Sequence, residues 1–383
     1  MARFLWASFD GGGNVPPSLG VARELVRRGH EVSFAGRPEL VRRMRRDGLP
    51  AIELTRSYAH ADRYDWHPRG RLFAYLTSPA VGDELLALAK AEGPDVMIID
   101  AMFGGALAAA PRFGLPTAVM LHTFLHRTID GWRVLMADES DARARSGFDP
   151  LPPLEAMWGE PDLLHVNSLR QLDCAPKVRW PNIRHGAPIL TDDGRAVPVE
   201  LPWPAGDPHP VALISFSTAL AQASLGKVQR SLDALADLPV HPVATVGDAI
   251  DPAALAIPAN AHVVRFAKHN PLVERAALVL THGGHGTAMR ALAHGVPLVC
   301  LAGRAADQEG VAALDQPRIA AFCEEREVGR MVDADAPAER IRAAARAVLE
   351  DPRYRANARA VGALLGARSG AAEAASAVER LVR

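Results

Sequence analysis

Hydrophobic and polar positions alternate along this chain in two kinds of segment. Short apolar runs bounded by glycine, proline or charged residues are typical of strands buried on both faces of a sheet. Between them lie longer segments in which apolar residues recur every three or four positions, as they do on one face of a helix. In the first half of the chain this pattern predicts strands at residues 4–9, 31–35, 95–99 and 117–121, and helices at 17–28 and 104–112.

The same alternation begins again after a proline-rich stretch at residues 180–210. Because strands that alternate with helices form parallel sheets, the pattern predicts an α/β protein with two doubly wound, Rossmann-like domains. We expect an N-terminal domain at 1–188, a linker at 189–209, a C-terminal domain at 210–366 and a separate terminal helix at 367–383. The second block is predicted to contain strands at 211–216, 242–246, 262–266, 277–280 and 298–301, a helix at 225–236, and three alanine-rich helices after residue 337.

Two segments, 55–70 and 123–150, show little periodicity and each follows a predicted strand. Long irregular segments inside compact domains often bind ligands, so both are expected to be binding loops.

Composition narrows the class of protein. With 49% hydrophobic residues, 23% charged residues and a formal net charge of −1, the chain gives no electrostatic reason to expect nucleic acid or an anionic membrane as a partner. Three widely spaced cysteines fit a reducing compartment better than a disulfide framework. Neither a signal peptide nor an apolar run long enough to span a bilayer is visible, so we expect a soluble cytoplasmic protein.

The strongest chemical signal is the turn after the predicted strand 277–280. It contains His282, glycines at 283, 284 and 286, and Thr287. Glycine allows a ligand to approach the backbone closely, and the free N–H groups at the start of the following helix favour an anion. The Gly-Lys-Ser/Thr ending of a phosphate-binding P-loop is missing, which makes an ATPase a poor interpretation.

This region resembles the donor site of GT-B glycosyltransferases, and is most similar to the bacterial enzymes that glycosylate macrolides, polyketides and phenols. The resemblance rests on His-Gly-Gly-x-Gly-Thr at 282–287, Gly-Val-Pro at 295–297 and Asp-Gln at 307–308, and it extends more weakly along most of the chain. It implies two domains that face a central cleft, and a last helix that returns to the N-terminal domain.

The resemblance also implies roles for residues of the donor half. His282 and Thr287 would contact the diphosphate beside Gly284 and Gly286, and the pair Asp307 and Gln308 would hold hydroxyls of the donor sugar.

Two further segments of this half match the family less closely. Ser217 and Thr218 belong to a Ser-Phe-Ser-Thr segment that resembles the family's Ser-Phe-Gly-Ser, which reaches the diphosphate. Phe266 and His269 fall where the family has Trp-x-Pro-Gln beside the nucleobase, although a plain core role for Phe266 is an equal alternative.

The acceptor half departs from the family pattern. Asn14 stands where members carry the histidine that deprotonates the acceptor, and an amide cannot accept a proton at neutral pH. Asn14 is expected to position the acceptor instead, with His126 lining the acceptor pocket. Asp100, at the end of a predicted strand, is the first choice for the base; Asp10 and His122 are alternatives, and each of these side chains also has a plausible structural role.

Together these features predict an inverting glycosyltransferase that needs no metal and no cofactor. It would move a hexose or deoxyhexose from a UDP or dTDP sugar to a small aromatic or polyketide-like acceptor, and the loss of the usual base allows C-glycosylation. The expected partners are therefore small molecules, and the protein is expected to be a monomer or a homodimer. Two alternatives stay open: an inactive sugar-nucleotide-binding helper protein, and a sugar-nucleotide epimerase of the same fold.

Overall fold

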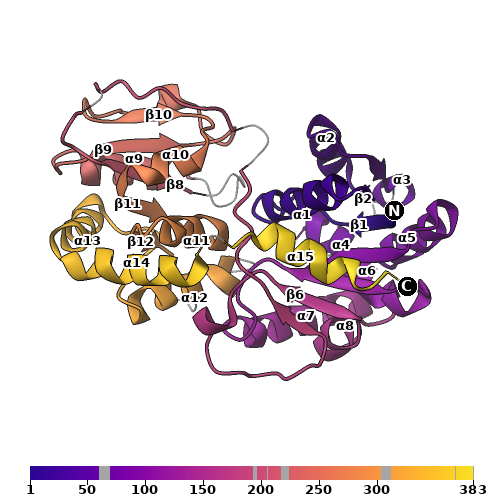
Figure 1. Ribbon diagram of the computed structural model, residues 1–383. Helices are drawn as coiled ribbons and strands as arrows, with labels where there is room; N and C mark the ends of the chain where they lie inside the picture. The colour runs from indigo at the N-terminus through magenta and orange to yellow at the C-terminus, as the bar shows by residue number, and fades with distance from the viewer. Residues whose placement is uncertain are drawn as a thin grey trace. The chain divides into compact units, whose positions relative to one another are not determined.

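The computed structural model describes residues 1–59, 70–192, 196–204, 206–216, 224–302, 312–366 and 368–382 (Figure 1). The chain divides into two compact units. Unit 1 comprises Met1–Ile189 and Ser369–Arg383, and unit 2 comprises Leu190–Arg368, which includes the stretch expected to be a linker.

Unit 1 contains a parallel sheet whose described strands lie in the order β3-β2-β1-β4-β5-β6-β7. These strands are β1 (Arg3–Ala7), β2 (Glu31–Gly36), β3 (Ala51–Glu53), β4 (Val96–Asp100), β5 (Thr117–Leu121), β6 (Leu163–Val166) and β7 (Ile183–His185). Its helices are α1 (Val15–Arg27), α2 (Pro38–Arg46), α3 (Thr55–Ala59), α4 (Arg71–Thr77), α5 (Pro79–Glu92), α6 (Gly104–Ala109), α7 (Ile129–Arg145), α8 (Leu154–Gly159) and α15 (Gly370–Glu379), with short 3₁₀ turns η2 (Ala110–Arg112) and η3 (Arg170–Leu172).

The strands of unit 1 follow from their composition. Every residue of β4 and β5 is buried, as expected for central strands that are covered by helices on both faces. The core on one face of the sheet joins side chains of β1, β2, α1 and α2, and the rings of Trp6 and Phe34 stack within it at 5.2 Å.

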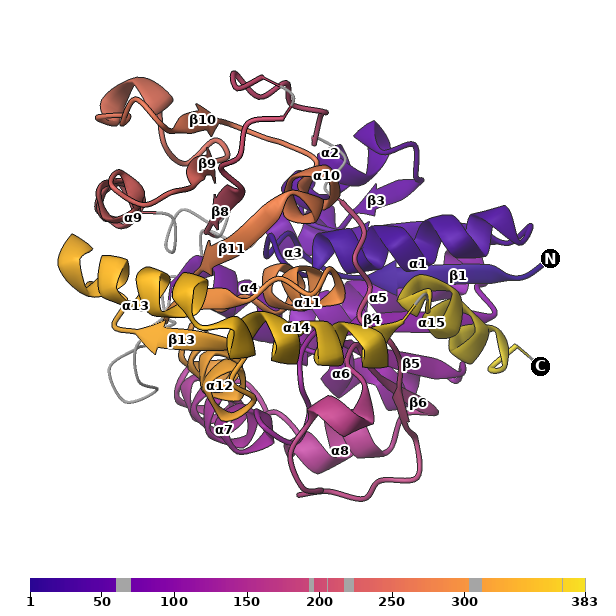
Figure 2. The same ribbon diagram turned by 60° about the vertical axis from the view of Figure 1, so that its left-hand side comes forward.

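Helix α15 completes this core although it is remote in sequence. Ala374, Ala375 and Val378 are fully buried in it, and α15 lies beside α1 in both views (Figures 1 and 2). Polar contacts reinforce the packing, because Arg28 donates hydrogen bonds to Ser376 at 2.8 Å and to Glu379 at 2.5 Å.

Unit 2 contains a second parallel sheet, with described strands in the order β10-β9-β8-β11-β12-β13. These strands are β8 (Val211–Ser215), β9 (His241–Thr245), β10 (His262–Val264), β11 (Ala276–Thr281), β12 (Leu298–Leu301) and β13 (Gly329–Val332). Its helices are α9 (Leu225–Leu235), α10 (His269–Glu274), α11 (His285–Ala293), α12 (Ala312–Glu325), α13 (Ala338–Glu350) and α14 (Pro352–Leu365), with one 3₁₀ turn, η4 (Pro252–Ala254).

Each sheet has a point at which the strand order reverses. In unit 1 the chain runs from β1 outward to β3 and then returns to β4 on the other side of β1. In unit 2 it runs from β8 outward to β10 and returns to β11 beside β8. Open parallel sheets bind ligands at the carboxyl ends of the strands that flank such a reversal.

The parallel, doubly wound sheets predicted from the sequence are confirmed, with strand and helix ends displaced by a few residues. The interpretation of residues 123–150 as an irregular loop was wrong, because α7 occupies most of that segment. The buried stripe of α7 includes Glu139 and Arg143, and these polar side chains hide its helical periodicity. Residues 55–70, expected to be a second loop, begin with α3, and 60–69 lie outside the described residues.

Candidate active site

Asp100 and Asn14 meet at the strand reversal of unit 1. Asp100 is the last residue of β4 and is 2% exposed, and Asn14 follows β1 immediately before α1. Nδ2 of Asn14 donates a hydrogen bond to Oδ2 of Asp100 at 2.9 Å, and the backbone N–H of Met102 donates to Oδ1 at 3.0 Å. The carboxylate is therefore held in one orientation at the position where such sheets bind ligands.

Both polar atoms of the Asn14 amide make hydrogen bonds within the protein. Besides Asp100, Nδ2 contacts the carbonyl oxygen of Phe9 at 3.0 Å, while Oδ1 accepts a hydrogen bond from the N–H of Gly11 at 3.0 Å. Asn14 thus fixes the turn after β1 and orients Asp100. The acceptor-binding role expected for Asn14 from the sequence stays a prediction.

His122 lies beside the same carboxylate. It follows β5, and its Nε2 is 3.3 Å from Oδ2 of Asp100. The angle is not that of a hydrogen bond, and neither ring nitrogen makes one to the described residues. A carboxylate and a largely buried imidazole, two groups able to take a proton, are thus adjacent at this edge.

The other two residues expected on the acceptor side have structural partners. Oδ1 of Asp10 accepts hydrogen bonds from Arg43 at 2.7 Å and from the N–H of Gly12 at 3.1 Å. His126 is buried, and burial lowers the pKa of its ring although the charge of Asp173 opposes this shift. Its Nδ1 accepts a hydrogen bond from the N–H of Lys177 at 3.3 Å.

The glycine turn in unit 2 follows β11 at the second strand reversal. Gly283 has φ of +84°, a backbone conformation that favours glycine, and a Cβ at Gly284 would lie 2.6 Å from Nε2 of His282. Apart from Gly286 itself, its chain neighbours and the backbone of its own helix, no atom of the described residues lies within 4 Å of the position that a Cβ at Gly286 would take. Helix α11 begins at His285 without a side-chain cap, so its first N–H groups are available to an anion.

His282 is held as a neutral imidazole in this turn. Burial, followed by the nearby charge of Lys227, lowers its pKa to about 3, and the backbone of Ser215 opposes the shift. A neutral imidazole has one N–H group, which can donate a hydrogen bond to an anion. Thr287, in the first turn of α11, is partly exposed on the same helix end.

Lys227 is a cation of this site that the sequence analysis did not identify. It lies in the first turn of α9, where the N–H of Lys227 bonds to the Ser224 side chain, and its ammonium is 5.6 Å from the centre of the Phe216 ring. Burial, followed by the charge of Arg230, lowers the pKa of Lys227. Among the described residues no carboxylate pairs with it.

The place of Lys227 near the start of a predicted helix is a signal that the sequence does contain. A cation in the first turn of a helix lies at the positive end of the helix dipole, where it is unfavourable without an anionic ligand.

The remaining residues expected at the donor site fall into two groups. His269 begins α10, and its Nε2 is 3.2 Å from Oγ1 of Thr245 at the end of β9, while Phe266 lies between β10 and α10. Four others lie outside the described residues, so the structure does not place them: Ser217, Thr218, Asp307 and Gln308.

Comparison with known proteins identifies the class. Residues 229–381 match the family model described as "Erythromycin biosynthesis protein CIII-like, C-terminal domain". The 4'-demethylrebeccamycin synthase of Lentzea aerocolonigenes is 26% identical over 432 residues, covering 100% of both chains. The oleandomycin glycosyltransferase of Streptomyces antibioticus is 25% identical over 388 residues, covering 96% of this chain and 88% of that enzyme.

A solved structure, that of the glycosyltransferase VinC in complex with dTDP, matches with a TM-score of 0.73 at 19% identity and covers 99% of both chains. The chain therefore has the GT-B fold. It is a glycosyltransferase similar to those of bacterial natural-product pathways, and the match to the erythromycin CIII-like model is confined to its C-terminal part. Within the described residues, no helix is both long enough and apolar enough to cross a bilayer.

Proposed function

We propose that this glycosyltransferase moves a hexose or deoxyhexose from a dTDP or UDP sugar to a small aromatic or polyketide-like acceptor, with inversion at the anomeric carbon. The observation that carries the proposal is the anion site of unit 2. The uncapped start of α11, the neutral His282 and the ammonium of Lys227, which pairs with no carboxylate of the described residues, all favour a diphosphate there. The relatives named above support the same class of donor and acceptor.

The reaction requires two events, and each unit supplies groups for one of them. A nucleophilic atom of the acceptor loses its proton and bonds to the anomeric carbon, while the bond from that carbon to the diphosphate oxygen breaks. We assign the proton to Asp100, oriented by Asn14, with His122 as the adjacent group that can share it.

The charge that develops on the leaving diphosphate would be stabilised by fixed donors in unit 2. The N–H groups of α11, the imidazole of His282 and the ammonium of Lys227 are already in place, so no metal ion or other cofactor is needed for this step. Asp307 and Gln308 would hold the sugar hydroxyls, as the family resemblance implies.

The absence of the usual base histidine leads to the finer part of the proposal. A carboxylate that removes a phenolic proton leaves negative charge on the ring carbons as well as on the oxygen, so a carbon atom of the acceptor can attack the sugar. We therefore include C-glycosylation of a phenolic ring among the products.

The test is incubation of the chelator-treated protein with dTDP and UDP sugars and a panel of phenolic and polyketide acceptors. Mass spectrometry should detect a glycosylated product together with an equal amount of released nucleoside diphosphate. A product that resists acid hydrolysis contains a C-glycosidic bond, whereas O-glycosides are cleaved.

Three outcomes would contradict the proposal. Donor binding without product on any acceptor would indicate a helper protein, and a new sugar nucleotide formed without acceptor would indicate an epimerase. Recovery of product only after a divalent metal is added back would contradict the metal-free step.

A further inference from the structure

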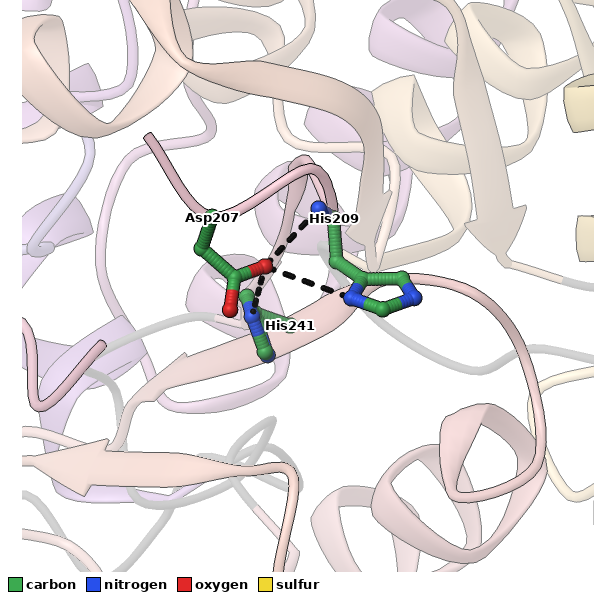
Figure 3. A group of neighbouring side chains, drawn as sticks. All are labelled: Asp207, His209 and His241. Carbon is green, nitrogen blue, oxygen red and sulfur yellow. Dashed lines mark hydrogen bonds and ion pairs between the residues drawn. The ribbon is translucent and has the colours of Figure 1, made fainter. Parts of the chain in front are cut away.

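Three side chains that commonly bind metals meet at the amino edge of the unit 2 sheet (Figure 3). Asp207 and His209 precede β8, and His241 is the first residue of β9. Oδ1 of Asp207 lies 2.9 Å from Nε2 of His241 and 3.2 Å from Nδ1 of His209. One ligand atom from each of the three residues lies within 4.8 Å of the other two.

This cluster is separate from the donor residues. Strands β8 and β9 are parallel and pair from Val211 and His241 at one edge to Ser215 and Thr245 at the other. The cluster lies where these strands begin, whereas His282 and the glycine turn follow the far end of the neighbouring strand β11. A ligand at the cluster is therefore no part of the transfer chemistry.

The spacing of the ligand atoms approaches that of a tetrahedral zinc ion. With zinc–nitrogen and zinc–oxygen bonds of about 2.0–2.2 Å, neighbouring ligand atoms are about 3.3 Å apart. Two of the three separations are already 2.9 and 3.2 Å. The third separation, between the His209 and His241 nitrogens, is at most 4.8 Å, and the His209 side chain is 47% exposed, which leaves room for the small rotation that would shorten it.

One of the three ligands is held rigidly. The ring of Trp203 stacks on the His241 imidazole with centroids 4.0 Å apart and an interplanar angle of 13°. The His241 side chain is only 10% exposed, and its Nε2 is directed at Asp207. A ligand that is already ordered loses little conformational freedom when a metal binds.

The chemistry of the donor atoms selects the kind of ion. Two imidazole nitrogens and one carboxylate oxygen form a set that zinc and similar transition metals prefer, whereas calcium and magnesium prefer oxygen alone.

We propose that Asp207, His209 and His241 form a binding site for a divalent transition-metal ion, for which Zn²⁺ is the best match, with water as the fourth ligand. In the metal-bound form the coordinating nitrogens, Nδ1 of His209 and Nε2 of His241, carry no proton, and each neutral ring keeps its one proton on its other nitrogen. Bound there, it fastens the segment that carries Asp207 and His209 to β9. The site is independent of the proposed function, since transfer uses the opposite edge of the sheet.

The experiment uses the untagged full-length chain after chelator treatment. Calorimetric titration with Zn²⁺ should show one saturable equivalent, and Co²⁺ in its place should give the visible absorption bands of a tetrahedral site. Because the ion binds the folded state, Zn²⁺ should also raise the thermal unfolding midpoint.

Two variants remove ligands, and one is a matched control. His209→Ala, at an exposed position, and Asp207→Asn should each lose the equivalent of Zn²⁺ and the Co²⁺ bands. His262→Ala should keep both, because His262 lies outside the cluster. It is a matched control because its ring also lies beside the Trp203 ring, with centroids 6.4 Å apart. Circular dichroism of the metal-free variants verifies that they are folded. Equal Zn²⁺ binding by the wild type and His209→Ala, including no binding by either, would overturn the proposal.

Discussion

At the scale of single residues, the candidate site depends on pairs of side chains more than on individual ones. Asp100 could be selected from the sequence because an acidic residue that ends an apolar strand lies at the carboxyl edge of the sheet, where such sheets bind ligands. Its partnership with Asn14 could not, since the two are 86 positions apart and meet only when β1 and β4 pair. Lys227 was not identified for a similar reason, because its burial and its proximity to His282 arise only in the folded unit.

Replacing Asp100 with asparagine tests the assignment of the base. An amide of the same shape cannot accept the proton, so kcat should fall by about 10²- to 10⁴-fold with little change in donor affinity. Steady-state kinetics and nucleotide binding measure the two effects. Asp10→Asn is the matched control, since Oδ1 of Asp10 is already engaged by Arg43 and Gly12, and near-normal turnover is expected. A larger loss of kcat in Asp10→Asn than in Asp100→Asn would refute the assignment.

Lys227→Gln tests the cation of the donor site. Hydrogen bonds to charged groups contribute about 1.5–3 kcal/mol, so dTDP or UDP should bind about ten- to hundred-fold more weakly. The free nucleosides lack the diphosphate and should bind equally to both proteins, which makes them the internal control. Calorimetry with each pair of ligands gives the comparison, and an equal loss for nucleoside and diphosphate would point to a structural role for Lys227.

A buried histidine should make unit 1 sensitive to acid. Burial, followed by the charge of His122, lowers the pKa of His165 from 6.5 to about 4. Between pH 6.5 and about pH 4 the His165 ring binds a proton in the unfolded chain but not in the folded chain. The free energy of unfolding therefore falls as the pH decreases through this range. The contribution of His165 is about 2 kcal/mol lost on going from pH 7 to pH 5.

His165→Gln should remove that part of the pH dependence. Urea unfolding of unit 1 at pH 7 and pH 5 measures it, and the partly exposed His262 provides a control variant, His262→Gln. An unchanged difference between the two pH values in His165→Gln would show that the ring does not carry the effect.

At the scale of secondary structure, the strands were the most predictable elements and the helices around the acceptor side the least. Strands such as β4 and β8 are apolar throughout because both faces of their sheets are covered. Helix α7 was missed because Glu139 and Arg143 lie in its buried stripe, and Arg143 reaches the carbonyl oxygen of Thr77 at 2.9 Å. Their partners belong to other elements, so the sequence pattern alone suggested a loop.

The two glycines at the start of α11 should respond differently to alanine. A Cβ at Gly284 would meet the His282 ring at 2.6 Å and displace it, so Gly284→Ala should weaken diphosphate binding. At Gly286 the Cβ position is open, and Gly286→Ala should raise the stability of the helix by about 0.5–1 kcal/mol. Thermal unfolding and dTDP titration of both variants test this contrast. Destabilisation by Gly286→Ala would mean that the turn has another constraint.

At the scale of the whole molecule, the chain builds one unit from two separate segments. The sequence pattern predicted two α/β sheets because the alternation of strand and helix begins twice. The internal contacts of α15 could not be derived from that pattern, since an alanine-rich helix fits many surfaces. In the structure its buried side chains complete the core of unit 1, where α15 packs against α1 and β6.

A chain that ends at Arg368 should therefore lose stability in unit 1. The buried alanine and valine side chains of α15 contribute roughly 4 kcal/mol by their apolar burial alone. Differential scanning calorimetry should show the unit 1 transition at a lower temperature and the unit 2 transition unchanged. Arg380→Ala, at an exposed position beside α15, serves as the control and should leave both transitions in place. Equal lowering of both transitions would contradict the assignment of α15 to unit 1.

The divided construction of unit 1 has a consequence for synthesis on the ribosome. Residues 1–189 emerge first, but the helix that closes their core is translated only after all of residues 190–368. At translation rates of about 5–20 residues per second, this interval is roughly ten to forty seconds. During it, the apolar surface that α15 later covers is exposed to solvent and to other nascent chains. Chaperones that bind apolar surface therefore have their longest opportunity to act on unit 1 while unit 2 is still being made.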